Sequence, residues 1–181
     1  MSEAPTGPSA ADLEALAGYA AALADGIAAA VGPWVERSVA SVCDRQGQLV
    51  TGKLRQQAAQ AGAVAAAEIG PKVRSLLSMD IDDQRVGPLE IVRGAVRFPT
   101  EVLREVGVPP VRRDESAVAM FPDDIYDLIP GSFGDLDPSL QETGLVWGAA
   151  KAHVFLARRR AAGQQKMRQI PRSHDSQTRN N

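Results

Sequence analysis

A cluster of carboxylates in the middle of the chain contains the first residues whose types could do chemistry. Asp80, Asp82 and Asp83 lie within four positions, and carboxylate oxygens are the ligands that Ca²⁺ and Mg²⁺ prefer. An EF-hand loop starting at Asp80 requires Gly at position 85 and Glu at position 91, where this chain carries Arg85 and Ile91. We therefore interpret the cluster as a solvated turn that caps the start of a helix, and we predict no metal site.

Four residues could act as nucleophiles, bases or ligands, and none has the neighbours that such chemistry requires. Ser132 has part of the pattern of a nucleophile elbow, but Pro130 replaces the first glycine and no strand precedes it. The single cysteine, Cys43, lies on the apolar side of a predicted helix, and we interpret it as a buried hydrophobe. His153 and His174 lack the second histidine, cysteine or spaced carboxylate of a metal site, and we expect His153 to be a partly buried structural residue.

Loops that bind phosphates or dinucleotides are also absent from the sequence. We therefore predict no catalytic residue and no cofactor. An enzyme whose groups assemble from distant positions stays open as an alternative, because no local motif is needed for such a site.

The distribution of charge is more informative than the net charge of -2. Residues 114–142 carry eight acidic side chains and no Lys or Arg, whereas residues 151–179 carry eight basic side chains and one acid. Two oppositely charged zones can each serve a charged partner, or they can bind each other.

The basic zone contains Arg158, Arg159 and Arg160 near the end of a predicted helix, where they could contact phosphates. These arginines also suit a helix C-terminus, whose dipole favours positive charge. No aromatic residues are interleaved with them, and the 16 Arg against 4 Lys match the bias of high-GC coding. Weak, non-specific nucleic-acid binding is therefore the alternative function.

The acidic zone contains a segment in which acids alternate with large apolar residues, including Phe121, Asp123, Asp124 and Tyr126. Such a segment can dock in a partner's groove or fold back on its own helices. Folding back is favoured, because aromatic residues make up only 4% of the chain and an apolar patch left exposed is uncommon. These four residues and the three arginines are the candidate partner-binding residues.

The N-terminal part of the chain predicts a helical hairpin or small bundle over residues 10–78. Large apolar residues recur at helical spacing over residues 10–31, in a seam formed by Leu13, Leu16, Ala20, Leu23 and Ile27. The pairs Gly32-Pro33 and Gly70-Pro71 predict breaks that separate helices over 34–44, 53–69 and 71–77. The seam, including Leu13, Leu16, Leu23 and Ile27, predicts either a core or a surface for self-association.

The second unit, residues 84–162, predicts two further helices around an irregular segment. The first starts after Gly87-Pro88, is kinked or split at Phe98 by Pro99, and ends at Gly107. Residues 107–138 contain five prolines and predict irregular structure with one short helix over 123–128. The last helix starts at Pro138, with an apolar stripe predicted from Leu145, Ala149, Ala152 and either Phe155 or Leu156.

We predict tails for the remaining residues and an all-α fold for the whole chain. Residues 1–9 are expected to be a flexible leader, and the basic residues 163–181 a disordered tail. The 44% apolar content includes 29 Ala, which suits helices that approach closely, and no strand-like alternation occurs.

The N-terminus lacks a signal-peptide pattern, and the uncharged apolar runs 15–24 and 26–35 are shorter than the about 20 residues needed to span a membrane. We therefore expect a cytoplasmic protein with no membrane partner.

These features together predict a non-enzymatic helical protein that acts through protein–protein contacts, as an adaptor or regulator. The apolar seam and the acidic–apolar segment motivate this hypothesis. The salt dependence of the affinity distinguishes this hypothesis from nucleic-acid binding, because phosphate contacts weaken steeply with salt and an apolar helical interface does not.

Overall fold

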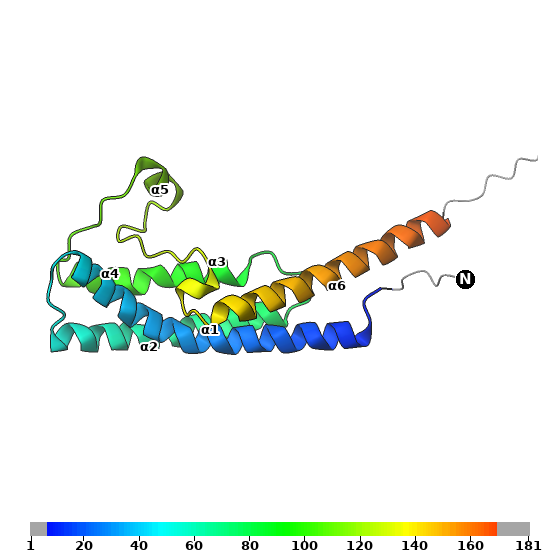
Figure 1. The fold of residues 1–181 in the computed structure, drawn as a ribbon, viewed down its shortest axis with the longest axis horizontal. Coiled ribbons are helices and arrows are strands. Elements are labelled where there is room, and N and C mark those ends of the chain that lie inside the picture. The colour runs from blue at the N-terminus through cyan, green and yellow to red at the C-terminus, as the bar shows by residue number, and fades with distance from the viewer. Residues whose placement is uncertain (1–6, 170–181) are drawn as a thin grey trace, which may run out of the picture.

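Two long antiparallel helices, α1 (Ala10–Arg45) and α2 (Gly52–Ser78), form the centre of the fold (Figure 1). The structure is a computed structural model and describes residues 7–169. α1 starts at a capping box, in which the Ser9 hydroxyl accepts the Asp12 N–H and the Asp12 carboxylate accepts the Ser9 N–H. α2 starts at Thr51, whose hydroxyl accepts the Leu54 N–H.

The predicted breaks at the two Gly-Pro pairs are wrong, because Pro33 lies inside α1 and Pro71 lies inside α2. The glycine beside Pro33 marks a close approach of the two helices: a Cβ on Gly62 would lie 2.7 Å from the carbonyl oxygen of Gly32. An interior proline costs a helix about 3 kcal/mol, and packing along the whole hairpin outweighs that local cost. α1 accommodates its proline by changing direction part-way along its length (Figure 1).

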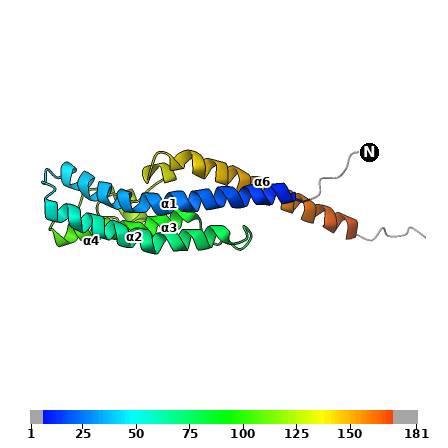
Figure 2. The ribbon, with the colours of Figure 1, turned by 90° about the horizontal axis from the view of Figure 1, so that it is seen from below.

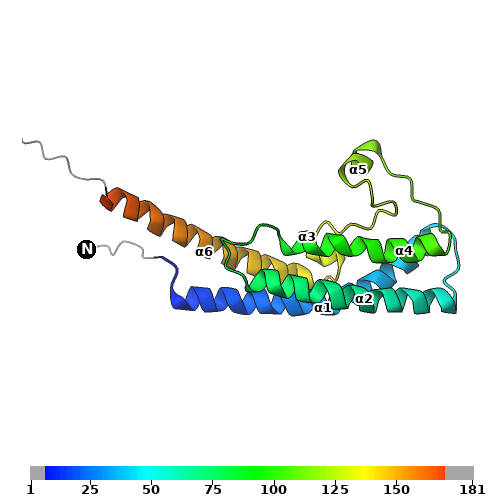
Figure 3. The same ribbon diagram turned by 180° about the vertical axis from the view of Figure 1, so that it is seen from behind.

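The next three elements run along α2 (Figure 3): α3 (Pro88–Arg93), the 3-10 turn η1 (Gly94–Val96) and α4 (Arg97–Glu105). The predicted interruption of this helix is present, but it lies at η1 and not at Phe98. Pro99 is the reason, since it has no N–H to donate to the carbonyl of Ala95 four residues earlier. The helix ends before Gly107, whose φ of 75° is unfavourable for other residues.

Residues 107–138 are largely irregular, as predicted, with one short helix, α5 (Glu115–Met120), and the 3-10 turn η2 (Phe133–Asp135). The predicted helix over 123–128 is wrong. The Asp124 carboxylate instead accepts the N–H groups of Leu128 and Ile129 and holds this stretch as a turn. The short helix begins earlier because the Asp114 side chain accepts the Ala117 N–H. α5 has no buried residue and stands away from the other helices (Figure 1).

The last helix, α6 (Leu140–Gln169), packs mainly on α1, which lies between α6 and α2 (Figure 2). It extends beyond the predicted boundary, so the prediction of disorder is wrong for residues 163–169, and residues 170–181 lie outside the described part of the chain. The first part of α1 and the last part of α6 project together past the end of α2 (Figure 3).

The apolar stripe predicted for α6 is not the face of the helix that packs on the core. Leu145 is 64% exposed and Leu156 is 51% exposed. The buried positions are Leu140, Trp147 and Val154, which recur every seven residues and pack on the core. α6 therefore carries two apolar faces, of which one is covered by the chain itself.

Most of the predicted seam of α1 is core. Leu16, Ala20, Leu23 and Ile27 are buried between α1, α2 and α6, whereas Leu13 is 39% exposed. Self-association through this seam would require the core to open. A second cluster, near the loop between α1 and α2, combines Val39, Val42, Cys43, Leu54, Leu103, Val108 and Tyr126.

α1 is long and apolar enough to cross a membrane by length and composition alone. Counting only uncharged runs excluded this property, because Asp25 divides the apolar stretch into residues 15–24 and 26–35. Core helices and signal sequences share it, and here Leu23, Ile27 and Val31 are buried within the chain. The cytoplasmic location stays a prediction.

The described residues form helices, turns and irregular segments without any strand, which confirms the all-α prediction. The architecture also follows the prediction in its outline: an N-terminal hairpin, an irregular Pro-rich acidic segment and a long C-terminal helix.

Candidate protein-binding site

Two of the predicted partner-binding residues in the acidic segment, Asp124 and Tyr126, are buried at the end of the molecule where the loop joins α1 to α2, which we name the closed end. Each is 1% exposed. The Tyr126 hydroxyl donates a hydrogen bond of 2.7 Å to the carbonyl of Val108, and burial raises the pKa of this tyrosine. The Asp124 carboxylate lies 3.7 Å from the guanidinium of Arg113, which is itself almost completely buried. These residues hold the segment against the chain's own helices.

The other two residues of that segment are more accessible. Phe121 is half-buried, with the Arg93 guanidinium 5.9 Å from the centre of its ring, and Asp123 is exposed. The acidic segment therefore offers a partner only its outer edge.

The three candidate arginines of α6 have different environments. Arg158 forms ion pairs with Asp80 and Asp82, two carboxylates of the cluster that was predicted to cap a helix. Arg159 and Arg160 are exposed, and the Arg159 guanidinium lies 5.8 Å from the centre of the Phe155 ring.

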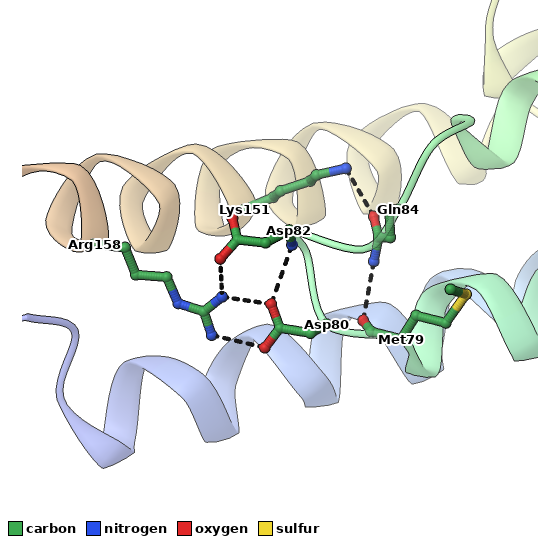
Figure 4. A network of polar contacts seen from close by, with 6 residues as sticks. All are labelled: Met79, Asp80, Asp82, Gln84, Lys151 and Arg158. Carbon is green, nitrogen blue, oxygen red and sulfur yellow. Dashed lines mark hydrogen bonds and ion pairs between the residues drawn. The ribbon is translucent and has the colours of Figure 1, made fainter. Parts of the chain in front are cut away.

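The carboxylates at 80 and 82 are thus partners of an arginine, as Figure 4 shows. The two guanidinium nitrogens of Arg158 donate to both oxygens of Asp80, and one of them also donates to Asp82 at 2.8 Å. These hydrogen bonds lower the pKa of Asp80 to about 2 and raise the pKa of Arg158. The predicted capping role is wrong, since α3 starts at Pro88 and its N-cap is Gly87, which has no side chain to cap the helix.

A second set of contacts fastens the same loop to α6 (Figure 4). Lys151 donates to the side-chain oxygen of Gln84 at 2.8 Å, and the Gln84 amide donates to the carbonyl of Met79 at 3.2 Å. The Lys151 ammonium lies 5.0 Å from the centre of the Trp147 ring, and burial lowers the pKa of this lysine. The loop 79–84 is thereby held beside α6 by contacts between residues that lie 67 to 78 positions apart in the sequence.

This loop forms one wall of an open cavity of about 510 Å³ that we name the end groove. α1 provides the opposite wall, and the C-terminal end of α2 and one side of α6 close the remaining sides. The apolar lining residues are Leu13, Leu16, Ala17, Ala20, Ala21, Ala24, Leu77, Met79, Ile81 and Trp147. A cavity of this size lined mainly by apolar side chains is suited to binding.

The polar groups of the end groove already have partners. Arg158 pairs with Asp80, and Arg74 pairs with Asp25 across the gap between α2 and α1. The Ser78 hydroxyl donates to the carbonyl of Ser75 at 2.9 Å. The groove thus offers apolar contact and no poised acid, base or nucleophile among its lining residues.

The other residues that sequence reasoning weighed for chemistry lie elsewhere. Burial raises the pKa of the Cys43 thiol, which disfavours the reactive thiolate. Ser132 caps η2 together with Asp135. The expectation of a partly buried His153 is wrong, because this residue is exposed and lies 3.5 Å from the Asp12 carboxylate. Among residues 7–169, no three side chains of the metal-binding types come together.

Sequence reasoning missed the end groove because its walls come from four separate parts of the chain. One signal was available: the predicted apolar seam begins at Leu13, close to the start of the first helix. Comparisons with protein-family models, with curated proteins and with solved structures find no match for this chain.

Proposed function

We propose that the protein is an adaptor that acts through protein–protein contacts, and that the end groove receives an amphipathic helix of a partner protein. One observation carries this proposal: the apolar surface of α1 continues past the end of α2 into the end groove, where Leu13, Ala17 and Ala21 are exposed. The part of α1 that packs on α2 and the part that lines the groove form one continuous face.

The lengths of the two helices support this interpretation. α1 has 36 residues and α2 has 27, so at 1.5 Å per residue α1 is longer by about 14 Å. A partner helix in the groove would lie beyond the end of α2, against the same seam of α1. Such a helix would extend a packing arrangement that the fold already uses.

The side chains of the α1 wall suit a helix better than a compact polar ligand. Ala17 and Ala21 are exposed and present small methyl groups, which let a second helix approach closely. A partner helix with apolar residues at spacings of three and four would place one face on this wall. Its polar face would remain in solvent, beside the paired charges at the rim.

A nucleic-acid-associated role is the second candidate, and the exposure of Arg159 and Arg160 favours it. Arg158 contributes less to that role, because two carboxylates already neutralise its charge. Phosphate binding through the remaining arginines would weaken steeply as salt is raised, whereas groove binding would persist.

The test is site-specific photo-crosslinking of the full chain in its native host. A photoreactive residue replaces Leu13, which is in the groove wall and exposed, and in a control protein it replaces Met120 on α5. We expect a protein adduct from position 13 that position 120 does not give. Ala17→Glu should abolish this adduct, and Ala22→Glu, an exposed neighbour on α1 outside the groove, should leave it intact.

The captured protein is then purified and its affinity for the full chain is measured. Placing a charge in the apolar groove should weaken binding about tenfold or more. An adduct that forms equally at both positions, or that is indifferent to Ala17→Glu, overturns the proposal. Retention of nucleic acid at low salt, without a protein adduct, would instead support the second candidate.

A further inference from the structure

The outer face of α6 carries an apolar stripe that no other part of the described chain covers. We name Leu145, Ala149, Ala152 and Leu156 the α6 stripe. All four are exposed, and they lie on the opposite side of the helix from the buried Trp147 and Val154. Spacings of four, three and four place them in one line along the helix.

The α6 stripe is the same when it is read from either end. Leucines lie at its two ends and alanines at its centre, and the spacing of four, three and four is symmetric. A second copy related by a two-fold axis midway between Ala149 and Ala152 would place each leucine opposite the other leucine and each alanine opposite the other alanine. An interface between two identical copies requires such self-complementarity, and the small central residues would let the two helices approach closely.

The charges at the ends of the α6 stripe determine the direction of pairing. Glu142 lies three residues before Leu145, and Arg159 lies three residues after Leu156; both are exposed. In an antiparallel pair, Glu142 of each copy lies opposite Arg159 of the other. In a parallel pair, Glu142 would lie opposite Glu142 and Arg159 opposite Arg159, which is unfavourable.

We propose that the protein self-associates as an antiparallel, two-fold symmetric dimer through the α6 stripe. This inference is independent of the proposed function, because the stripe faces away from the end groove. Pairing through α6 leaves both grooves open, since Trp147 and Arg158 line the groove from the other side of the helix. The dimer would present two such grooves.

Analytical ultracentrifugation of the full chain over a thousand-fold range of concentration tests the association. We expect a monomer–dimer equilibrium, with a limiting mass of twice 19.2 kDa. Leu145→Glu or Leu156→Glu should weaken dimerisation about 100-fold or more, because each change places two charges in the interface. Val64→Glu, a change at an exposed position of α2, should leave the equilibrium unchanged.

Charge exchange tests the orientation. Glu142→Arg or Arg159→Glu alone should weaken the dimer about three- to tenfold, and the double variant should restore it. Thermal melts of every variant should match the parent at low concentration, because all these residues are exposed in the monomer. A chain that is monomeric at every concentration overturns the inference. Failure of the double variant to restore association, or a dimer that tolerates both stripe substitutions, overturns it equally.

Discussion

The two ends of the molecule use the same kind of helix in different ways. At the closed end, where a short loop joins α1 to α2, the apolar faces of both helices are covered by α4 and by the irregular segment that carries Tyr126. At the open end, α2 stops and the apolar surfaces of α1 and α6 remain uncovered in the end groove and the α6 stripe. Apolar periodicity therefore identifies a packing face, but it does not show whether the partner belongs to the same chain.

If this comparison is correct, apolar or charged residues that the chain itself covers determine stability, and similar residues that it leaves exposed do not. The largest expected difference in stability is between two neighbouring residues, Asp123 and Asp124, which the sequence pattern predicted to have the same role. Asp124→Ala would leave the buried guanidinium of Arg113 without its carboxylate and remove two backbone hydrogen bonds, at about 3–5 kcal/mol of unfolding free energy. Asp123→Ala should change stability by less than about 0.5 kcal/mol. Urea unfolding of both variants measures the difference; equal losses would contradict the burial of Asp124.

A leucine in each apolar stripe gives the next largest contrast. Leu23 is completely buried in the seam of α1, and Leu23→Ala should destabilise the fold by about 2–5 kcal/mol. Leu145 lies in the α6 stripe, and Leu145→Ala should change monomer stability by at most about 0.5 kcal/mol. Thermal unfolding at low protein concentration checks both, and a large loss from Leu145→Ala would mean that the outer face of α6 is packed after all.

The crossing of α1 and α2 should be sensitive to a single methyl group. Gly62→Ala would place its Cβ 2.7 Å from the Gly32 carbonyl oxygen, and the clash is with backbone, so we expect a loss of about 1–3 kcal/mol. Gly18→Ala is the matched control in the open part of α1, where a Cβ meets nothing within 4 Å. It should stabilise the helix by about 0.5–1 kcal/mol. Chemical denaturation of both variants measures these changes in unfolding free energy. A Gly62→Ala variant that is more stable than the parent would contradict the close crossing of α1 and α2.

The sequence predicted the features that depend on local chemistry. Helical periodicity gave the all-α class, Ser9 marked the start of the first helix, and the prolines of residues 107–138 indicated irregular structure. The errors arose where tertiary packing overrides local preference. Gly32-Pro33 has the composition of a helix stop, yet the glycine is needed for contact with α2 and the helix continues.

The candidate site was less predictable for the same reason. α6 has two apolar faces, and the sequence alone does not decide whether Trp147 or Leu145 is buried. Arg158 and Asp80 are 78 residues apart, so their pairing depends on how α6 lies against the loop. Local patterns identified the residues of the basic cluster, but only the fold separates the paired Arg158 from the exposed Arg159.

The smallest predicted effect concerns the ion pair that closes the open end. Arg158 lowers the pKa of Asp80 from its ordinary value of 3.8 to about 2, so the folded state favours the ionised carboxylate. The stability that this contributes is present above about pH 4 and is lost as the pH falls toward about 2. Because the Asp80 side chain is about half exposed, solvent limits the contribution to about 0–1 kcal/mol.

Asp80→Asn should therefore be slightly less stable than the parent at neutral pH, and the difference should vanish at about pH 2. Asp83→Asn is the control, since Asp83 forms no ion pair among the described residues. A difference between Asp80→Asn and the parent that grows on acidification would have the wrong sign, and would show that Arg158 does not hold Asp80 ionised at the open end.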